Sequence, residues 1–233
     1  MMNTKINENE GKNNITELVF ILDRSGSMSG LEKDTIGGFN SMIQKQKEEE
    51  GQVIISTVLF DHNISVLHDR QNLENIQALT EKDYYVGGCT ALLDAVGQSI
   101  KHINDVQKKM PANERPTKTM FVITTDGQEN SSHKYNYDKI KKMVEKKQDK
   151  KGWEFLFLGA NMDAIKAAGD IGIKANRSVN FHCDAEGTAV NYKALSKAVS
   201  KFRACEATVE AKAVALDNWD EEIAEDYAAR AEK

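Results

Sequence analysis

The stretch LVFILDRSGSMSG (18–30) decides the fold. Five apolar residues precede Asp23, and a loop of serines and glycines follows it. An apolar run without alternation is typical of a strand that is covered on both faces, as in a parallel sheet. Ser25 and Ser27 then place two hydroxyls at alternate positions, and Gly26 allows the turn between them to curl back. We therefore expect a buried strand that delivers three oxygen donors to one short loop.

Similar apolar runs recur along the chain. The predicted strands are 18–23, 53–61, 64–69, 118–126, 153–160 and 177–181. Only the second and third are too close for a crossover helix, and the two residues between them fit a tight hairpin. The fold class is therefore predicted as α/β: a doubly wound, mostly parallel sheet with one antiparallel edge strand and helices on both faces.

Helical patterns separate these strands. Apolar residues at helical spacing predict helices from Leu31 to the polar run before Gly51, and over 90–106, 137–152 and 187–202. In the third helix, Tyr137, Ile140, Met143 and Val144 form the predicted apolar stripe. Its many lysines are then read as the solvated back of an amphipathic helix and not as a nucleic-acid surface.

Charge and cysteine usage limit the possible functions. The net charge is −5 and the pI is about 5.6, which argues against a nucleic-acid-binding surface. Three widely spaced cysteines without a CxxC pair indicate a reducing compartment. The sequence shows neither a secretory signal nor an apolar run of membrane-spanning length, so we expect a cytoplasmic protein that does not bind membranes.

Two further segments bring oxygen donors toward the loop after Asp23. The predicted strand 118–126 ends in TDG, so Asp126 lies beside Asp23 if the two strands are neighbours. Two adjacent carboxylates repel each other unless a dication neutralises them, and hard oxygen donors suit Mg²⁺. Thr90 follows two glycines at the start of a predicted helix. Its hydroxyl is either a further ligand or an ordinary helix N-cap.

These pieces resemble a known family. DxSxS at 23–27, GGxT ending at Thr90 and TDG starting at Asp126 occur in the order typical of the von Willebrand factor type A (vWA) domain and its metal-ion-dependent adhesion site. The resemblance runs from Glu17 to about Phe181 and is strongest to bacterial members. It implies metal binding, directly or through water, by a set of five residues: Asp23, Ser25, Ser27, Thr90 and Asp126. Cys89 stands where many relatives have a small polar residue.

The sequence also suggests how the chain is organised, although the resemblance does not extend to the acidic end. We expect a flexible segment at 1–15, a vWA-like domain at 16–204 and an acidic helix or tail at 205–233 that belongs to the same domain. The last 17 residues carry seven acidic and two basic side chains. Trp219, Ile223 and Tyr227, spaced by four, would pack this helix against the domain.

The predicted function is a non-enzymatic, metal-dependent protein-interaction module. Its cation, Mg²⁺ or alternatively Mn²⁺ or Ca²⁺, would coordinate an Asp or Glu of a protein partner. A metal-dependent hydrolase or phosphotransferase is the alternative, and a scaffold that binds no metal is a third hypothesis. Several enzyme motifs fail: Ser25 stands where aspartyl-phosphate phosphatases need a second aspartate, and Met28 occupies the centre of a GxSxG-like run.

Overall fold

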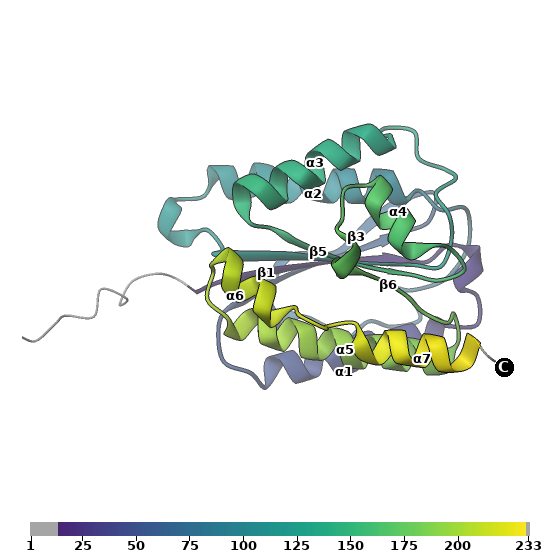
Figure 1. Cartoon of the computed structure of the whole chain (residues 1–233). Coiled ribbons are helices and arrows are strands. Elements are labelled where there is room, and N and C mark those ends of the chain that lie inside the picture. The colour runs from purple at the N-terminus through teal and green to yellow at the C-terminus, as the bar shows by residue number, and fades with distance from the viewer. Residues whose placement is uncertain (1–13, 232–233) are drawn as a thin grey trace, which may run out of the picture.

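A six-stranded sheet runs through the middle of the computed structural model, which describes residues 14–231 (Figure 1). The strand order is β3-β2-β1-β4-β5-β6. All neighbours pair in parallel except β2 and β3, which are antiparallel. The strands are β1 (Thr16–Asp23), β2 (Val53–Phe60), β3 (Ile64–Asn72), β4 (Lys118–Thr125), β5 (Glu154–Gly159) and β6 (Ser178–Asn180). This confirms the predicted sheet with its antiparallel edge strand.

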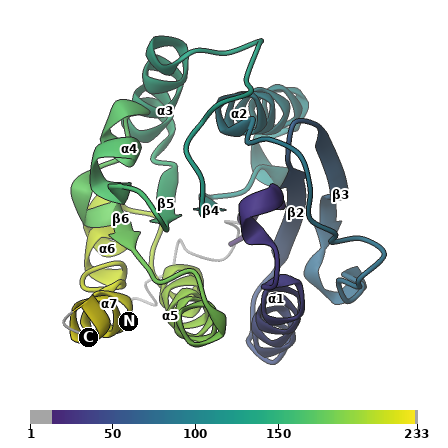
Figure 2. The ribbon, with the colours of Figure 1, turned by 90° about the vertical axis from the view of Figure 1, so that its right-hand side faces the viewer.

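Helices cover both faces of this sheet, as predicted. One layer contains α2 (Leu92–Lys109), α3 (Tyr137–Lys151) and α4 (Ala164–Asp170). The opposite layer contains α1 (Glu32–Lys47), α5 (Ala185–Ala204), α6 (Val209–Ala215) and α7 (Glu221–Ala231). Figure 2, which looks along the sheet, shows the two layers separated by the strands.

The buried central strand explains why its apolar residues do not alternate with polar ones. Val19 and Ile21 pack into the cluster formed with α2, α3 and α4, whereas Leu18, Phe20 and Leu22 pack into the cluster formed with α1 and α5. All five side chains are at most 2% exposed. Each such burial contributes roughly 1.5–3 kcal/mol, so both faces of β1 hold the strand in place.

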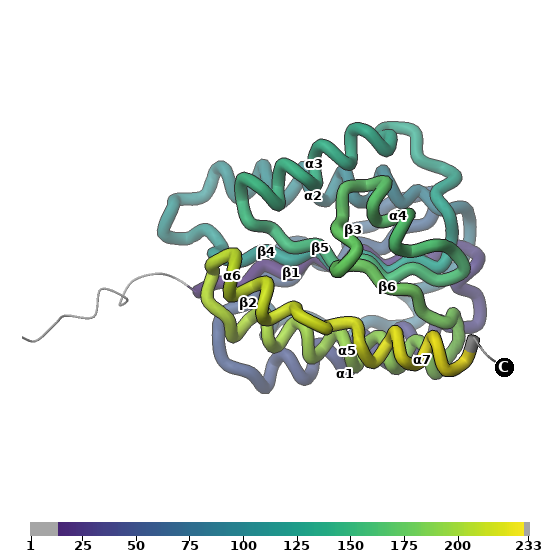
Figure 3. Tube along the Cα trace, in the orientation of Figure 1, coloured from purple at the N-terminus to yellow at the C-terminus, as the bar shows by residue number. Residues whose placement is uncertain are grey.

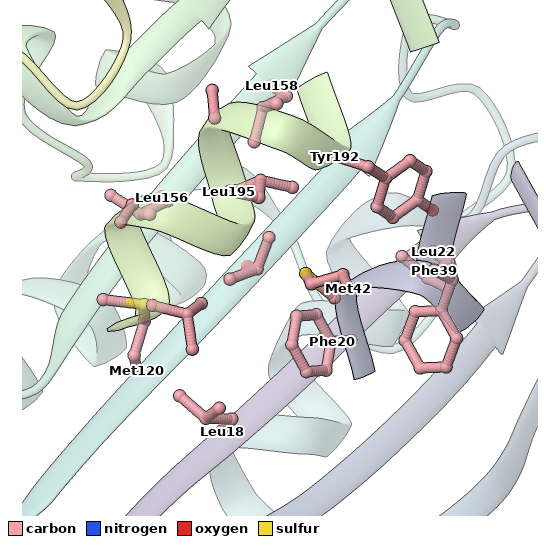
Figure 4. Close-up of a cluster of buried hydrophobic side chains, with 14 of the residues drawn as sticks. Leu18, Phe20, Leu22, Phe39, Met42, Met120, Leu156, Leu158, Tyr192 and Leu195 are labelled. Carbon is pink, nitrogen blue, oxygen red and sulfur yellow. The ribbon is translucent and has the colours of Figure 1, made fainter. Parts of the chain in front are cut away.

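Aromatic residues connect the helices to these two clusters. Phe20 meets Phe39 of α1 edge to face, with ring centroids 5.5 Å apart (Figure 4). On the other face Phe121 stacks against Trp153 at 5.3 Å and Phe155 at 4.9 Å. These contacts fix β1 and β4, the two central strands that end at the candidate site.

The C-terminal part of the chain turns back along α5 through α6 and α7 (Figure 3). Trp219 is 5% and Ile223 is 1% exposed, and the Trp219 indole donates a hydrogen bond to the carbonyl oxygen of Asn176 (3.2 Å). Arg230 forms an ion pair with Asp184 (2.6 Å) just before α5. The acidic segment is therefore packed against the layer that contains α5.

Some boundaries differ from the prediction. Apart from Asn14 and Ile15, the predicted flexible segment 1–15 lies outside the described residues. Tyr137 was wrongly assigned to the apolar stripe of α3, because its side chain is 45% exposed. Ile140 and Val144 are buried, and the partly buried Met143 packs against the same core. The seven-residue helices α4 and α6 were not predicted. Within 14–231, no helix has both the length and the apolar character that a membrane crossing requires.

Candidate functional site

Asp23 and Asp126 lie at the same edge of the sheet, at the ends of its two central strands. β1 and β4 are parallel neighbours, with Leu22 opposite Thr124. Asp23 is the last residue of β1, and Asp126 directly follows β4. Both side chains are 1% exposed. Figure 2 shows this edge facing the viewer, with the loop after β1 near its centre.

The two loop serines join the aspartates in one hydrogen-bond network. The backbone N–H of Ser25 donates to Asp23 Oδ1 (2.7 Å), so the loop curls back over the strand end. The hydroxyl oxygens of Ser25 and Ser27 lie 3.1 Å apart. Ser27 Oγ donates in turn to Asp126 Oδ1 (2.5 Å). Four of the five predicted site residues are thus in direct hydrogen-bond contact.

Thr90, the fifth predicted residue, lies beside the same cluster. A Cβ atom built on Gly127 would be 3.2 Å from Thr90 Oγ1 and 3.3 Å from Ser27 Oγ, so both hydroxyls lie next to the residue after Asp126. Thr90 is not the N-cap of α2. That position belongs to Ala91, which makes no side-chain cap hydrogen bond. The structure therefore brings all five predicted residues together and leaves the Thr90 hydroxyl free of a capping role.

The close approach of two hydroxyls to Gly127 gives a first prediction. We expect Gly127→Ala to weaken Mg²⁺ binding about 10-fold, an effect of the size seen when groups around metal ligands are changed. The added methyl group would press on both hydroxyl oxygens, while the backbone of Gly127, which is not left-handed, accepts alanine without strain. Calorimetric titration with Mg²⁺ measures the affinity.

Gly37→Ala on α1 is the matched control, because a Cβ there would meet nothing within 4 Å. We expect Gly37→Ala to leave Mg²⁺ binding unchanged. Equal Mg²⁺ affinities for the Gly127→Ala and Gly37→Ala variants would contradict the expectation that the hydroxyls of Ser27 and Thr90 take part in metal binding.

A second layer of buried groups positions Asp23, and sequence reasoning missed it. Thr125 Oγ1 donates to Asp23 Oδ2 (2.6 Å). The phenol of Tyr84 donates to the carbonyl oxygen of Asp23 (2.5 Å), and burial raises the pKa of Tyr84 well above its ordinary value, so this donor keeps its proton. Thr125 adjoins Asp126 in the TTDG run. No periodic pattern points to Tyr84.

The loop after Asp126 is attached to the start of α2. Glu129 Oε2 accepts from the backbone N–H of Leu93 (2.9 Å), and Asn130 Oδ1 accepts from the N–H of Thr90 (2.9 Å). Asp94 in turn accepts from the N–H groups of 133–135. Glu129 and Asn130 thus supply hydrogen-bond acceptors for backbone N–H groups at the start of α2. Their side chains hold the loop after Asp126 against this helix.

Cys183, which follows β6, also reaches the site. Its Sγ atom donates to Asp126 Oδ2 (3.3 Å). Burial, together with the charge of Asp126, raises the pKa of Cys183 to about 12. The side chain is therefore a neutral thiol that stabilises the Asp126 carboxylate. Because Cys183 is 57 residues from Asp126, no local motif could have indicated this contact.

The electrostatics of Asp23 fit a cation site. Burial raises the pKa of Asp23 to about 6, against the lowering effect of hydrogen bonds from Thr125 and Ser25, and the charge of Asp126 raises it further. Neighbouring Arg24 is directed elsewhere, because its Nε atom lies 3.0 Å from Asp61 Oδ2. Two buried carboxylates thus lie together, and no basic side chain among residues 14–231 forms an ion pair with either of them. A dication would remove this unfavourable interaction.

The donor set suits a hard cation. Within 14–231, no group of three or more His, Cys, Asp or Glu side chains could hold a metal ion. A cation here would therefore depend on two carboxylates and neutral hydroxyls. These are the oxygen donors that Mg²⁺ accepts while keeping part of its shell for water or a ligand. The residues present fit such an ion.

The fold of this chain resembles that of solved structures. No protein-family model matches the sequence, and no curated protein matches it. Among solved structures, a von Willebrand factor type A protein from Catenulispora acidiphila superimposes with a TM-score of 0.53 at 14% identity, covering 84% of this chain and 44% of that one. The chain has the vWA fold.

Two further solved structures are similar to this chain in fold. The pilus adhesin SpaC of Lactobacillus rhamnosus GG gives a TM-score of 0.61 at 12% identity, covering 80% of this chain and 30% of that chain. Proximal thread matrix protein 1 from the mussel byssus gives 0.57 at 14% identity, covering 80% and 46%. This chain therefore spans less than half the length of each of these three structures. At these identities the likeness establishes the fold alone.

Proposed function

We propose that this chain is a non-enzymatic protein-interaction module in which a bound divalent cation coordinates an Asp or Glu of a partner protein. The oxygen donors of the site favour Mg²⁺ as this cation. The observation that carries the proposal is the pairing of Asp23 and Asp126. Both are buried at the ends of adjacent strands, and the hydroxyls of Ser25, Ser27 and Thr90 lie around them.

The charge balance of this site favours a cation that binds a further ligand over a cation that only stabilises the fold. Two carboxylates neutralise a dication, and the three hydroxyls add no charge. The ion therefore stays electrophilic enough to bind a further anionic oxygen. A partner carboxylate is the common protein group that supplies such an oxygen. The occurrence of this fold in a pilus adhesin is consistent with a binding role.

Metal-dependent capture of a partner tests this function. We expect immobilised chain to retain a specific protein from lysate in Mg²⁺ and to release it when a chelator is added. Asp126→Asn should abolish this retention, and replacing one acidic residue of the captured protein by its amide should abolish it too. Retention that is equal with and without chelator would overturn the proposal.

The hydrolase alternative predicts a different result. A metal-dependent hydrolase or phosphotransferase would use the cation as a Lewis acid. Turnover of generic phosphate esters in Mn²⁺ that is lost in Asp126→Asn would support this alternative over the binding module. We expect no such turnover.

A further inference from the structure

Behind Asp23 lies a small internal cavity, and several of its polar groups have no hydrogen-bond partner within the described residues. It offers about 10 Å³ to the centre of a water-sized molecule, and Asp23 is part of its wall. Three wall residues each contribute one buried oxygen without a hydrogen-bond partner: Thr124 Oγ1 from β4, and Asn191 Oδ1 and Tyr192 OH from α5. A fourth wall oxygen, Thr35 Oγ1 from α1, interacts with the side chain of Tyr84.

Leaving these oxygens unpartnered is unfavourable, because a buried polar group without a hydrogen bond loses its interaction with water and gains none in return. Asn191 and Tyr192 are 2% and 6% exposed, so bulk solvent does not supply the partner. A cavity of roughly 10–15 Å³ holds one water molecule when 2–4 polar groups surround it. The cavity volume and the three unpartnered oxygens meet both conditions.

We propose that this cavity binds a single water molecule that joins α5 to β4, beside the end of β1, and that Asn191 and Tyr192 are thereby positioning residues for the candidate metal site. The chemistry of the wall matches water. The amide oxygen of Asn191 accepts one of its hydrogens, and hydroxyls such as that of Tyr192 donate to its lone pairs. A cation would use only lone pairs and would bring a charge against apolar wall residues such as Leu22 and Leu195.

The surrounding contacts show what this water would connect. The ring of Tyr192 packs against Gly38 of α1, where a Cβ atom would collide with it, and Figure 4 shows the same ring near Leu22 at the end of β1. The far end of α5 is held directly, because Arg203 donates to the carbonyl oxygen and to Oε1 of Gln46 (2.6 and 2.8 Å). At the end of α5 nearest the site, the bound water provides the polar link between α5 and Thr124 of β4, the strand that leads to Asp126.

The direction in which Tyr192→Phe changes the Tm distinguishes a hydrated cavity from a dry one. If the Tyr192 hydroxyl is bonded to water, Tyr192→Phe removes a satisfied group, and we expect the Tm to fall by about 2–4 °C. If the cavity is dry, the same substitution removes an unsatisfied buried hydroxyl, and the Tm rises. Tyr227→Phe on α7 removes a hydroxyl outside the cavity wall and serves as the control with little expected change.

A crystal structure at high resolution locates the occupant. We expect one water peak within hydrogen-bond distance of Tyr192 OH and Asn191 Oδ1, and a Tm that does not change when Na⁺ is replaced by choline at constant ionic strength. A cavity without density, a Tm that rises in Tyr192→Phe, or a Na⁺-dependent Tm would each overturn the water site.

The positioning role rests on the metal-binding function proposed above, and Mg²⁺ titration tests it separately. We expect Tyr192→Phe to weaken Mg²⁺ binding about 10-fold and Tyr227→Phe to leave it unchanged. Unchanged Mg²⁺ affinity in Tyr192→Phe would refute the positioning role. Absence of Mg²⁺ binding in the parent chain would instead refute the proposed function, and the water site would still be decided by the Tm and the density.

Discussion

Replacing Asp126 by asparagine is expected to reduce Mg²⁺ affinity at least about 100-fold, more than the 10–100-fold typical for groups that only support metal ligands. The substitution keeps the size of the side chain and removes one of the two negative charges that would neutralise the ion. Ser27 Oγ can still donate to the amide oxygen in place of Asp126 Oδ1, so the loop is retained. Calorimetric titration of the folded variant measures the loss.

Asp163→Asn is the matched control for this experiment. Asp163 precedes α4, and its carboxylate caps the N–H of Lys166 (2.9 Å), a role that asparagine fills equally well. The control therefore removes one exposed negative charge without touching the cluster, and we expect its Mg²⁺ affinity to match the parent. Similar losses in Asp163→Asn and Asp126→Asn would show that overall charge, and not coordination, controls binding.

Asp23→Asn is expected to have opposite effects on stability and on metal binding. Burial raises the pKa of Asp23 from 3.8 to about 6. Between these two values the folded chain retains a proton that the unfolded chain releases, so rising pH destabilises the fold, and the full cost applies above pH 6. That cost is about 3 kcal/mol. Asparagine cannot ionise and avoids it.

Thermal unfolding in the presence of a chelator tests this prediction, and the measured quantity is the difference in Tm between the variant and the parent. At pH 7.5 we expect Asp23→Asn to melt higher than the parent, and the difference should shrink as the pH falls from 6 toward 4. The local geometry is compatible, because an amide oxygen can accept from the N–H of Ser25 and the amide nitrogen can donate to Thr125. Mg²⁺ should stabilise the parent and not the variant. A variant that melts lower at pH 7.5, or a difference independent of pH, would refute this account.

The sheet could be predicted because its signals are local. Each central strand is a continuous apolar run, and the two-residue gap between the predicted strands 53–61 and 64–69 fits a tight hairpin. The class and the antiparallel edge therefore follow from short stretches. The placement of Asp126 beside Asp23 required one further step, which is that parallel strands end at the same edge of a sheet.

The remaining features depend on contacts between distant segments. Cys183 and Tyr84 reach the cluster from elements far away in the chain, and neither belongs to a spacing pattern. The N-cap alternative for Thr90 could not be decided locally, because the amide of Leu93 is bonded by Glu129 from another loop. The short helices α4 and α6 offer too few turns for a periodic signal.

The central claim is that five oxygen-bearing side chains share one divalent cation, and anomalous diffraction from a crystal soaked in Mn²⁺ tests it most directly. We expect a single strong peak between β1 and β4, within direct or water-mediated coordination distance of the Ser25, Ser27 and Thr90 hydroxyls and of the Asp23 and Asp126 carboxylates. A crystal at saturating Mn²⁺ with no anomalous peak at that position would contradict the account.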